Sequence, residues 1–149
     1  MSNAPHPKNA RLDALIGTWR TCGEVLGEDG STPVAAVDGS DAYEWLGGHF
    51  VIHRIDVHMG GEPVRGLEII GPFDPETGAY PTRAYDDRGG IQTATADVTD
   101  DGVWTFRADG AEATLRTTDD GQSMRADWLR TDDGGATWRP WLRLRFTRA

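Results

Sequence analysis

Glycine-containing turns recur at short, nearly regular intervals after residue 17, and they constrain the fold more than any other feature of the sequence. Glycine tolerates the positive φ angles that tight hairpin turns require, and aspartate often accompanies it in such turns. We therefore expect short links between antiparallel strands rather than helices. The predicted turns lie at 27–30, 47–48, 59–62, 74–78, 88–90, 101–102, 109–110, 120–121 and 133–135.

The segments between these turns predict a short helix followed by ten strands. The helix is expected over 11–16, where apolar residues share one helical face, with Asn9 as a candidate N-cap and Gly17 at its end. The segment Gly27–Asp38 is expected to be irregular and to cross or cover one end of the fold. The strands are expected near 18–26, 39–46, 49–58, 64–71, 80–87, 91–98, 102–108, 112–118, 123–131 and 137–147.

A meander of this length would expose two sheet edges unless it closed on itself. The sequence therefore predicts an all-β fold, an antiparallel up-and-down barrel of about ten strands. Alternation in the last strand predicts an inward face and an outward face. The third strand, 49–58, is apolar on both faces, so either the helix packs over it or a bulge changes its face. In the last strand the inward set is Trp138, Pro140, Leu142, Leu144 and Phe146, and the outward set is Arg139, Trp141, Arg143, Arg145 and Thr147.

Length and charge limit the domain organisation and the partners. The 149 residues suit one barrel domain over 11–149, preceded by a flexible polar arm over 1–10. A net charge of −9 argues against binding to nucleic acid or to an anionic membrane surface, because both require a concentrated basic face. The sequence shows neither a signal peptide nor an apolar run long enough to cross a bilayer, so we expect a cytoplasmic protein.

The start of the first predicted strand resembles the opening signature of the lipocalin-like (calycin) barrels. That signature is a short helix, Gly-x-Trp and the first strand, and it is matched here by Gly17-Thr18-Trp19. In those barrels the tryptophan packs into the barrel floor, and a basic residue late in the chain often covers it. The resemblance implies this covering role for Arg143 or Arg145, through a cation–π contact.

Further segments are similar to a bacterial barrel family of unknown function, which is itself similar to the haem-binding nitrobindins. The resemblance covers about 12–148, and it departs from nitrobindin at two points. Thr21 stands where nitrobindins have a second glycine, and no histidine follows His58 to match their late haem ligand. We therefore expect no haem and no other cofactor. The similar segments are 43–54, 68–71, 85–87, 133–138 and 144–148.

Three histidines lie on the third predicted strand. Even spacing places His49 and His53 on one face and His58 on the other, so we expect no metal site there. His53 lies in the middle of an apolar run, where a polar side chain needs a partner. It is either a satisfied core residue or a residue that contacts a ligand or transfers a proton.

The candidate ligand-binding residues are His53 and the polar and aromatic side chains expected near it. Glu44 on the preceding strand or Glu68 on the following strand could approach His53 and form an acid–base pair. Arg54 and Arg83 could hold an anionic group, or each could form an outward salt bridge. Aromatic residues could line a pocket or simply fill the core. The favoured set is His53, Glu44, Arg83, Tyr85 and Trp128, with Trp45, Trp104 and Trp138 as further aromatic candidates.

Three functions follow from this interpretation. The favoured one is binding of a small hydrophobic or amphipathic molecule inside the barrel. The second is a small cofactor-free enzyme, an isomerase, cyclase or hydrolase, that uses His53 with a neighbouring glutamate. The third is a solid-cored barrel that acts through its surface, for example as a homodimer formed at an exposed strand edge or at the barrel mouth. A nitrobindin-like haem protein is disfavoured because of the missing late histidine.

Overall fold

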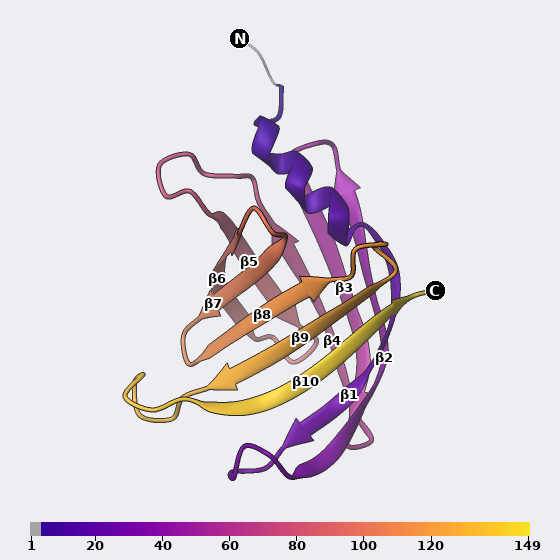
Figure 1. Ribbon diagram of the computed structural model, residues 1–149, viewed down its shortest axis with the longest axis vertical. Helices are drawn as coiled ribbons and strands as arrows, with labels where there is room; N and C mark the ends of the chain where they lie inside the picture. Colours follow the sequence, from indigo (N-terminus) through magenta and orange to yellow (C-terminus); the bar gives the residue numbers. More distant parts are fainter. Residues whose placement is uncertain (1–3) are drawn as a thin grey trace.

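Ten strands follow a short N-terminal helix in the computed structural model, which describes residues 4–149 (Figure 1). Each strand pairs antiparallel with the next, and β1 also pairs with β10, so the sheet closes. The predicted up-and-down barrel is confirmed. The elements are η1 (Pro7–Leu15), β1 (Gly17–Leu26), β2 (Pro33–Leu46), β3 (Phe50–Met59), β4 (Glu62–Ile70), β5 (Tyr80–Asp86), β6 (Ile91–Val98), β7 (Val103–Ala108), β8 (Ala111–Thr117), β9 (Ser123–Arg130) and β10 (Arg139–Arg148).

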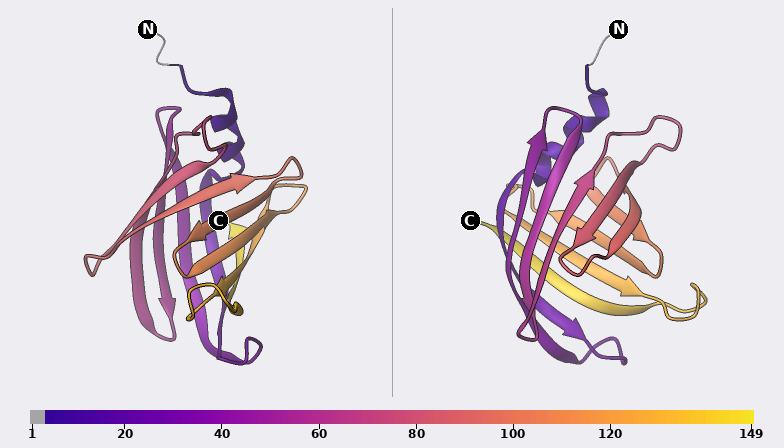
Figure 2. Two further views of the ribbon diagram at one scale, coloured as in Figure 1. Left: turned by 90° about the vertical axis from the view of Figure 1, so that its left-hand side faces the viewer. Right: turned by 180° about the vertical axis from the view of Figure 1, so that it is seen from behind.

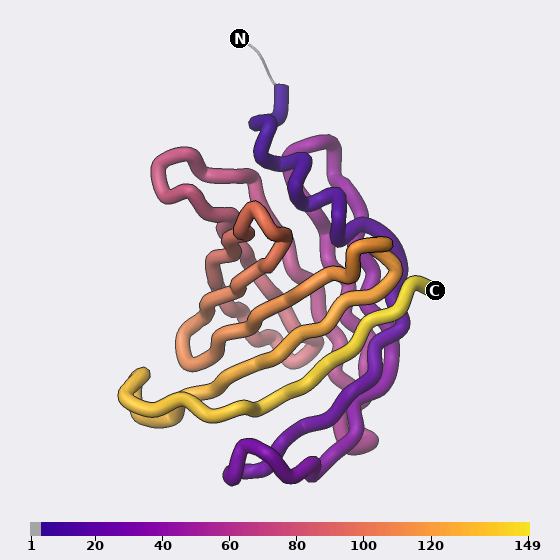
Figure 3. The backbone as a smooth tube through the Cα atoms, in the orientation of Figure 1, coloured from indigo at the N-terminus to yellow at the C-terminus, as the bar shows by residue number. Residues whose placement is uncertain are grey.

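Closure places the first strand, β1, beside the last strand, β10 (Figure 3). Their register pairs Trp19 with Arg148 and Val25 with Leu142. Every strand therefore has two hydrogen-bonded neighbours, which removes the exposed edges of an open meander. The described residues contain no helix long and apolar enough to span a membrane.

The helix η1 covers one end of the barrel, as both views in Figure 2 show. Leu12, Leu15 and Trp19 are fully buried there, and the Trp19 indole N–H donates a 2.9 Å hydrogen bond to the Leu15 carbonyl. The guanidinium of Arg148 lies 4.1 Å from the centre of the Trp19 ring. The implied cation–π cover therefore exists, but Arg148 supplies it, so the assignment to Arg143 or Arg145 is wrong.

The Arg148 contact also explains the glycine of the Gly-x-Trp motif. Gly17 has a φ of +134°, and a Cβ atom there would come within 2.3 Å of a guanidinium nitrogen of Arg148. The same guanidinium donates a 2.7 Å hydrogen bond to the Ile16 carbonyl. A side chain at position 17 would therefore displace the group that covers Trp19.

The helix begins earlier than the sequence indicated. It starts at Pro7, and His6 is its N-cap, so Asn9 lies inside the helix and the arm predicted over 1–10 is shorter. Asn9 is buried because its side chain joins the helix to the barrel. It donates to the Gly48 carbonyl at 3.2 Å and accepts from the Phe73 N–H at 2.8 Å. Residues 1–3 of the predicted arm lie outside the described part of the chain.

The second strand also begins earlier than predicted, at Pro33, so the second half of the segment Gly27–Asp38 is strand and not irregular. The turn before it is short because Asp29 closes it. The Asp29 carboxylate accepts hydrogen bonds from the backbone N–H groups of Ser31 and Thr32. A single aspartate that satisfies two backbone donors lets the chain reverse within a few residues.

The pairing of β3 and β10 shows which of the predicted inward and outward positions are correct. The pairing of β3 with β2 and β4 runs without a register shift, so the proposed bulge in β3 is wrong. In β10 the inward placement of Leu142, Leu144 and Phe146 is confirmed. The register shifts between Pro140 and Leu142, and Trp141 consequently lines the interior instead of facing outward. Trp138 precedes the strand and is 41% exposed.

Candidate functional site

A cavity of about 390 Å³ lies inside the barrel, on the side away from η1. Its lining reaches residues beside the hairpins that join β3 to β4, β5 to β6, β7 to β8 and β9 to β10. The helix end, by contrast, is filled by Trp19, Tyr80 and Trp104, each at most 1% exposed. The barrel is therefore solid at one end and hollow at the other.

Small side chains create the hollow part. Inward positions of β5 to β9 carry alanine where a filled barrel would carry larger residues. Pairing across the strands makes these positions contiguous, since Ala94 pairs with Ala108 and Ala108 pairs with Ala111. Aromatic and aliphatic residues close the rest of this wall. Six alanines line the cavity: Ala84, Ala94, Ala108, Ala111, Ala113 and Ala126.

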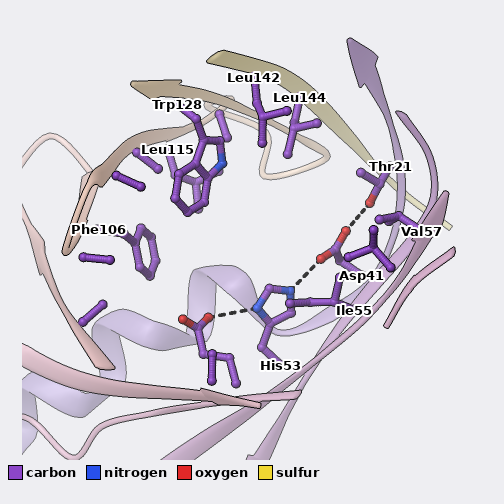
Figure 4. A pocket seen from close by; sticks show the side chains of 18 of the residues that line it. Thr21, Asp41, His53, Ile55, Val57, Phe106, Leu115, Trp128, Leu142 and Leu144 are labelled. Carbon is purple, nitrogen blue, oxygen red and sulfur yellow. Dashed lines mark hydrogen bonds and ion pairs between the residues drawn. The ribbon is translucent and has the colours of Figure 1, made fainter. Parts of the chain in front are cut away.

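The opposite wall carries a chain of hydrogen-bonded polar side chains (Figure 4). His53 Nε2 lies 2.6 Å from Asp41 Oδ1, and His53 Nδ1 lies 3.0 Å from Glu68 Oε1. The Thr21 hydroxyl donates to Asp41 Oδ2. These four residues come from β1, β2, β3 and β4, so adjacent strands assemble the chain.

Strand register explains why these residues meet. His53 on β3 pairs directly with Glu68 on β4 and with Tyr43 on β2. Asp41 lies two residues before Tyr43 and so shares its inward face, diagonal to His53, within reach of a side chain. The prediction that Glu68 approaches His53 therefore matches the structure. Glu44 is one residue from Tyr43 and points to the outer surface.

The imidazole of His53 has a carboxylate at each nitrogen, so both nitrogens act as donors and the ring is protonated. Burial disfavours the charged ring, but the hydrogen bonds that the ring donates to Asp41 and Glu68, together with the negative charges of these carboxylates, outweigh this and raise the pKa of His53 to about 9. At neutral pH the ring is therefore an imidazolium held between two carboxylates.

Tyr43 supports the imidazolium from one side. Its ring stacks on His53 with centroids 4.0 Å apart and an angle of 10° between the planes. Burial, together with the negative charges of Asp41 and Glu68, raises the pKa of Tyr43 well above its usual value. The phenol therefore stays neutral and provides a π face to the cationic ring.

The structure brings together some of the predicted site residues and not others. His53 and Trp128 line the cavity. Glu44 lies outside and pairs with Arg54 at 3.1 Å, with both side chains exposed. Arg83 and Tyr85 also face outward, because Thr82 and Ala84 occupy the inward positions of β5.

Of the other aromatic candidates, none lines the cavity. Trp104 is buried in the filled end, Trp45 donates a hydrogen bond to Asp13, and Trp138 is exposed. Phe106 and Trp141 take their place as aromatic lining residues. Asp41, Tyr43 and Thr21 were also missed. Alternation along 39–46 could have indicated Asp41, because it shares a face with Tyr43.

The donor atoms present do not fit a histidine-ligated haem. Within residues 4–149, His53 is the one histidine that lines the cavity, and each of its nitrogens already contacts a carboxylate. No imidazole lone pair is then free to coordinate iron. The described residues also contain no group of three or more histidine, cysteine, aspartate or glutamate side chains that could hold a metal ion.

Comparison with solved structures finds the same fold in natural and designed barrels. The crystal structure of Rv2717c from M. tuberculosis matches with a TM-score of 0.67 at 15% identity, over 98% of this chain and 99% of that chain. A de novo designed fluorescence-activating β-barrel matches with a TM-score of 0.50 at 15% identity, over 95% of this chain and 98% of that one. The structure of EF1p2_mFAP2b bound to DFHBI matches with a TM-score of 0.52 at 12% identity, over the same shares.

Comparison by sequence gives a family without an assigned activity. No curated protein matches this chain. The model of the family described as "Protein of unknown function (DUF1579)" matches residues 4–128, which is most of the chain. The finer relationship to lipocalins and nitrobindins stays a prediction. The chain belongs to the DUF1579 family of proteins of unknown function.

Proposed function

We propose that this barrel binds a small amphipathic organic molecule in its interior. The observation that carries the proposal is the two-sided cavity, in which an apolar wall of alanine and aromatic residues faces the chain Thr21–Asp41–His53–Glu68. Ligand sites in proteins usually combine a mostly apolar lining with a few placed polar groups. A volume of about 390 Å³ suits a molecule of one or two fused rings.

Three further points support binding over a purely structural role. An internal void costs stability, because the side chains around it lose packing contacts. The buried polar chain adds a desolvation cost that an apolar core would avoid. A barrel of this fold solved with DFHBI bound is consistent with small-molecule binding. The solid-cored alternative is disfavoured by the cavity itself.

Filling the cavity tests the proposal. Ala113 lines the cavity and is 2% exposed, so Ala113→Leu should occupy the void without reaching the surface. We expect native mass spectrometry of protein purified from its own host to detect a small bound molecule on the unmodified chain and at least about tenfold less on the variant. Its unfolding midpoint should be unchanged or higher, because a filled cavity restores packing.

A matched control changes an alanine away from the cavity. Ala36→Leu places the same side chain on β2 at an exposed site outside the lining, and binding should be unchanged. Equal amounts of a bound molecule on the Ala113→Leu variant and the unmodified chain would place the binding outside the barrel. The absence of any bound mass, together with no change of tryptophan fluorescence on addition of candidate ligands, would contradict the proposal.

One observation favours proton transfer as a second candidate function. Glu68 lies on the cavity and is oriented by His53 at 3.0 Å, which is the arrangement of a positioned general base. His53 itself has no free nitrogen, so Glu68 would contact the substrate. Activity in a screen of isomerase and hydrolase substrates should then fall at least about a hundredfold in Glu68→Gln. Activity that persists in this variant would exclude the role.

A further inference from the structure

The ionisable groups that line the cavity do not balance in charge. Within the described residues they are Asp41, Tyr43, His53 and Glu68, and no arginine or lysine lines the cavity. Two carboxylates therefore face one imidazolium, while the Tyr43 phenol stays neutral. The cavity carries one excess negative charge among apolar side chains, where an uncompensated charge is costly.

The excess charge lies at Glu68 rather than at Asp41. Both oxygens of Asp41 have partners, since Oδ1 contacts His53 and Oδ2 accepts from Thr21. The bond from His53 to Glu68 uses Oε1, which leaves the lone pairs of Oε2 for a group in the cavity. The Glu68 side chain is also 17% exposed, against 7% for Asp41.

A second polar atom without a partner lies near Glu68. The hydroxyl of Thr82 has no hydrogen-bond partner among residues 4–149, although Thr82 is 4% exposed and belongs to the cavity lining. Glu68 on β4 pairs with Ala84 on β5, so Thr82 is its diagonal neighbour on the same inward face. A buried hydroxyl without a partner costs free energy, and a ligand donor placed here would satisfy it.

The opposite wall is suited to an apolar body and to positive charge. Phe106 and Trp128 lie across the cavity from His53 (Figure 4), and Trp141 packs edge-on against Trp128 with centroids 6.2 Å apart. Aromatic faces attract cations and pack against flat apolar groups. The net charge of −9 on the chain also favours the approach of a cation over that of an anion.

We propose that the ligand is a small organic amine, whose ammonium group binds Glu68 and Thr82 and whose apolar body lies against Phe106 and Trp128. This inference rests on the proposed interior binding and names its ligand class. An ammonium group cancels the excess charge and donates to both free acceptors. A carboxylate ligand, such as a fatty acid, would add a second uncompensated negative charge and is excluded by the same reasoning.

Three probes with one ring system test the inference on the unmodified chain. They are 2-naphthylmethylamine, 2-naphthylmethanol and 2-naphthoate, which differ in charge and hardly in size. Binding of each probe at pH 7 is measured by isothermal titration calorimetry. We expect the amine to bind at least about tenfold more tightly than the alcohol and the carboxylate to bind most weakly.

Two variants test whether Glu68 causes the preference for the amine. Glu68→Gln should remove most of the tenfold preference for the amine and leave the alcohol nearly unchanged, whereas Glu44→Gln, on the outer face of β2, should change neither. Equal or tighter binding of the carboxylate would overturn the inference while interior binding stands. If no probe binds at millimolar concentration the inference is overturned, and the mass measurement on protein from its own host decides the proposed function separately.

Discussion

The free energy of unfolding should fall by about 3 kcal/mol as the pH rises from 6.5 to above 9, because His53 loses its proton in the folded protein only at high pH. The pKa of His53 is raised from 6.5 to about 9 by its carboxylate partners, and each unit of pKa difference corresponds to about 1.4 kcal/mol. Since the folded pKa is the higher one, the stabilisation is complete below pH 6.5 and is lost as the pH rises through 9.

Urea unfolding at a series of pH values, on the unmodified chain and on His53→Gln, measures this effect. Glutamine can still hydrogen-bond but does not titrate, so the difference between the two curves isolates His53 from the other histidines and from Cys22. The groups that face the ring are Asp41 and Tyr43 from β2 and Glu68 from β4. Parallel curves would show that His53 is not held as an imidazolium.

The strand count and the closure of the barrel could be predicted because they depend on local chemistry. Glycine-containing turns mark the hairpins, and a long meander must close to protect its edges. The errors in the predicted fold arose where a few residues override the pattern of turns and of alternating faces. The Asp29 turn lets β2 begin at Pro33, and the register shift before Leu142 turns Trp141 inward. Neither side-chain capping of one turn nor a single bulge leaves a clear periodic signal.

The site was predicted less completely because alternation gives the face of a residue but not its partner on the next strand. His53 was identified from its polarity within an apolar run, whereas the choice between Glu44 and Glu68 depended on register. Pairing of His53 with Tyr43 sends Glu44 outward and brings Asp41 inward. A shift of one residue would have exchanged these roles.

The cavity volume was not predictable from the aromatic residues, on which the sequence interpretation concentrated. Aromatic side chains fill the end of the barrel beside η1, where the ring centroids of Trp104 and Tyr80 lie 5.3 Å apart. The hollow part follows from alanine at successive inward positions, such as Ala111 and Ala113. Small residues at inward positions of neighbouring strands are the signal that could have indicated it, because space inside a barrel depends on side-chain size.

Removing Asp41 from the buried pair Asp41–His53 should lower the free energy of unfolding much more than removing Glu44 from the exposed pair Glu44–Arg54. Asp41→Asn is expected to lower the free energy of unfolding by about 1.5–3 kcal/mol, since it replaces one of the two charge-assisted hydrogen bonds of the buried imidazolium, while Glu68 still balances the charge of the ring. The comparison pair, Glu44 and Arg54, joins the same two strands on the outer face, where the side chains are 58% and 62% exposed. Glu44→Gln should cost less than about 1 kcal/mol.

Double-mutant cycles on the two pairs separate the interaction from the loss of each side chain. We expect a coupling of about 2 kcal/mol or more between Asp41→Asn and His53→Gln at pH 7, and less than about 0.5 kcal/mol between Glu44→Gln and Arg54→Gln. Equal coupling energies would show that Asp41 and His53 interact no more strongly than the exposed pair Glu44 and Arg54. A large coupling at pH 7 that shrinks above pH 9 would identify the charged ring as its source, because only the imidazolium attracts both carboxylates.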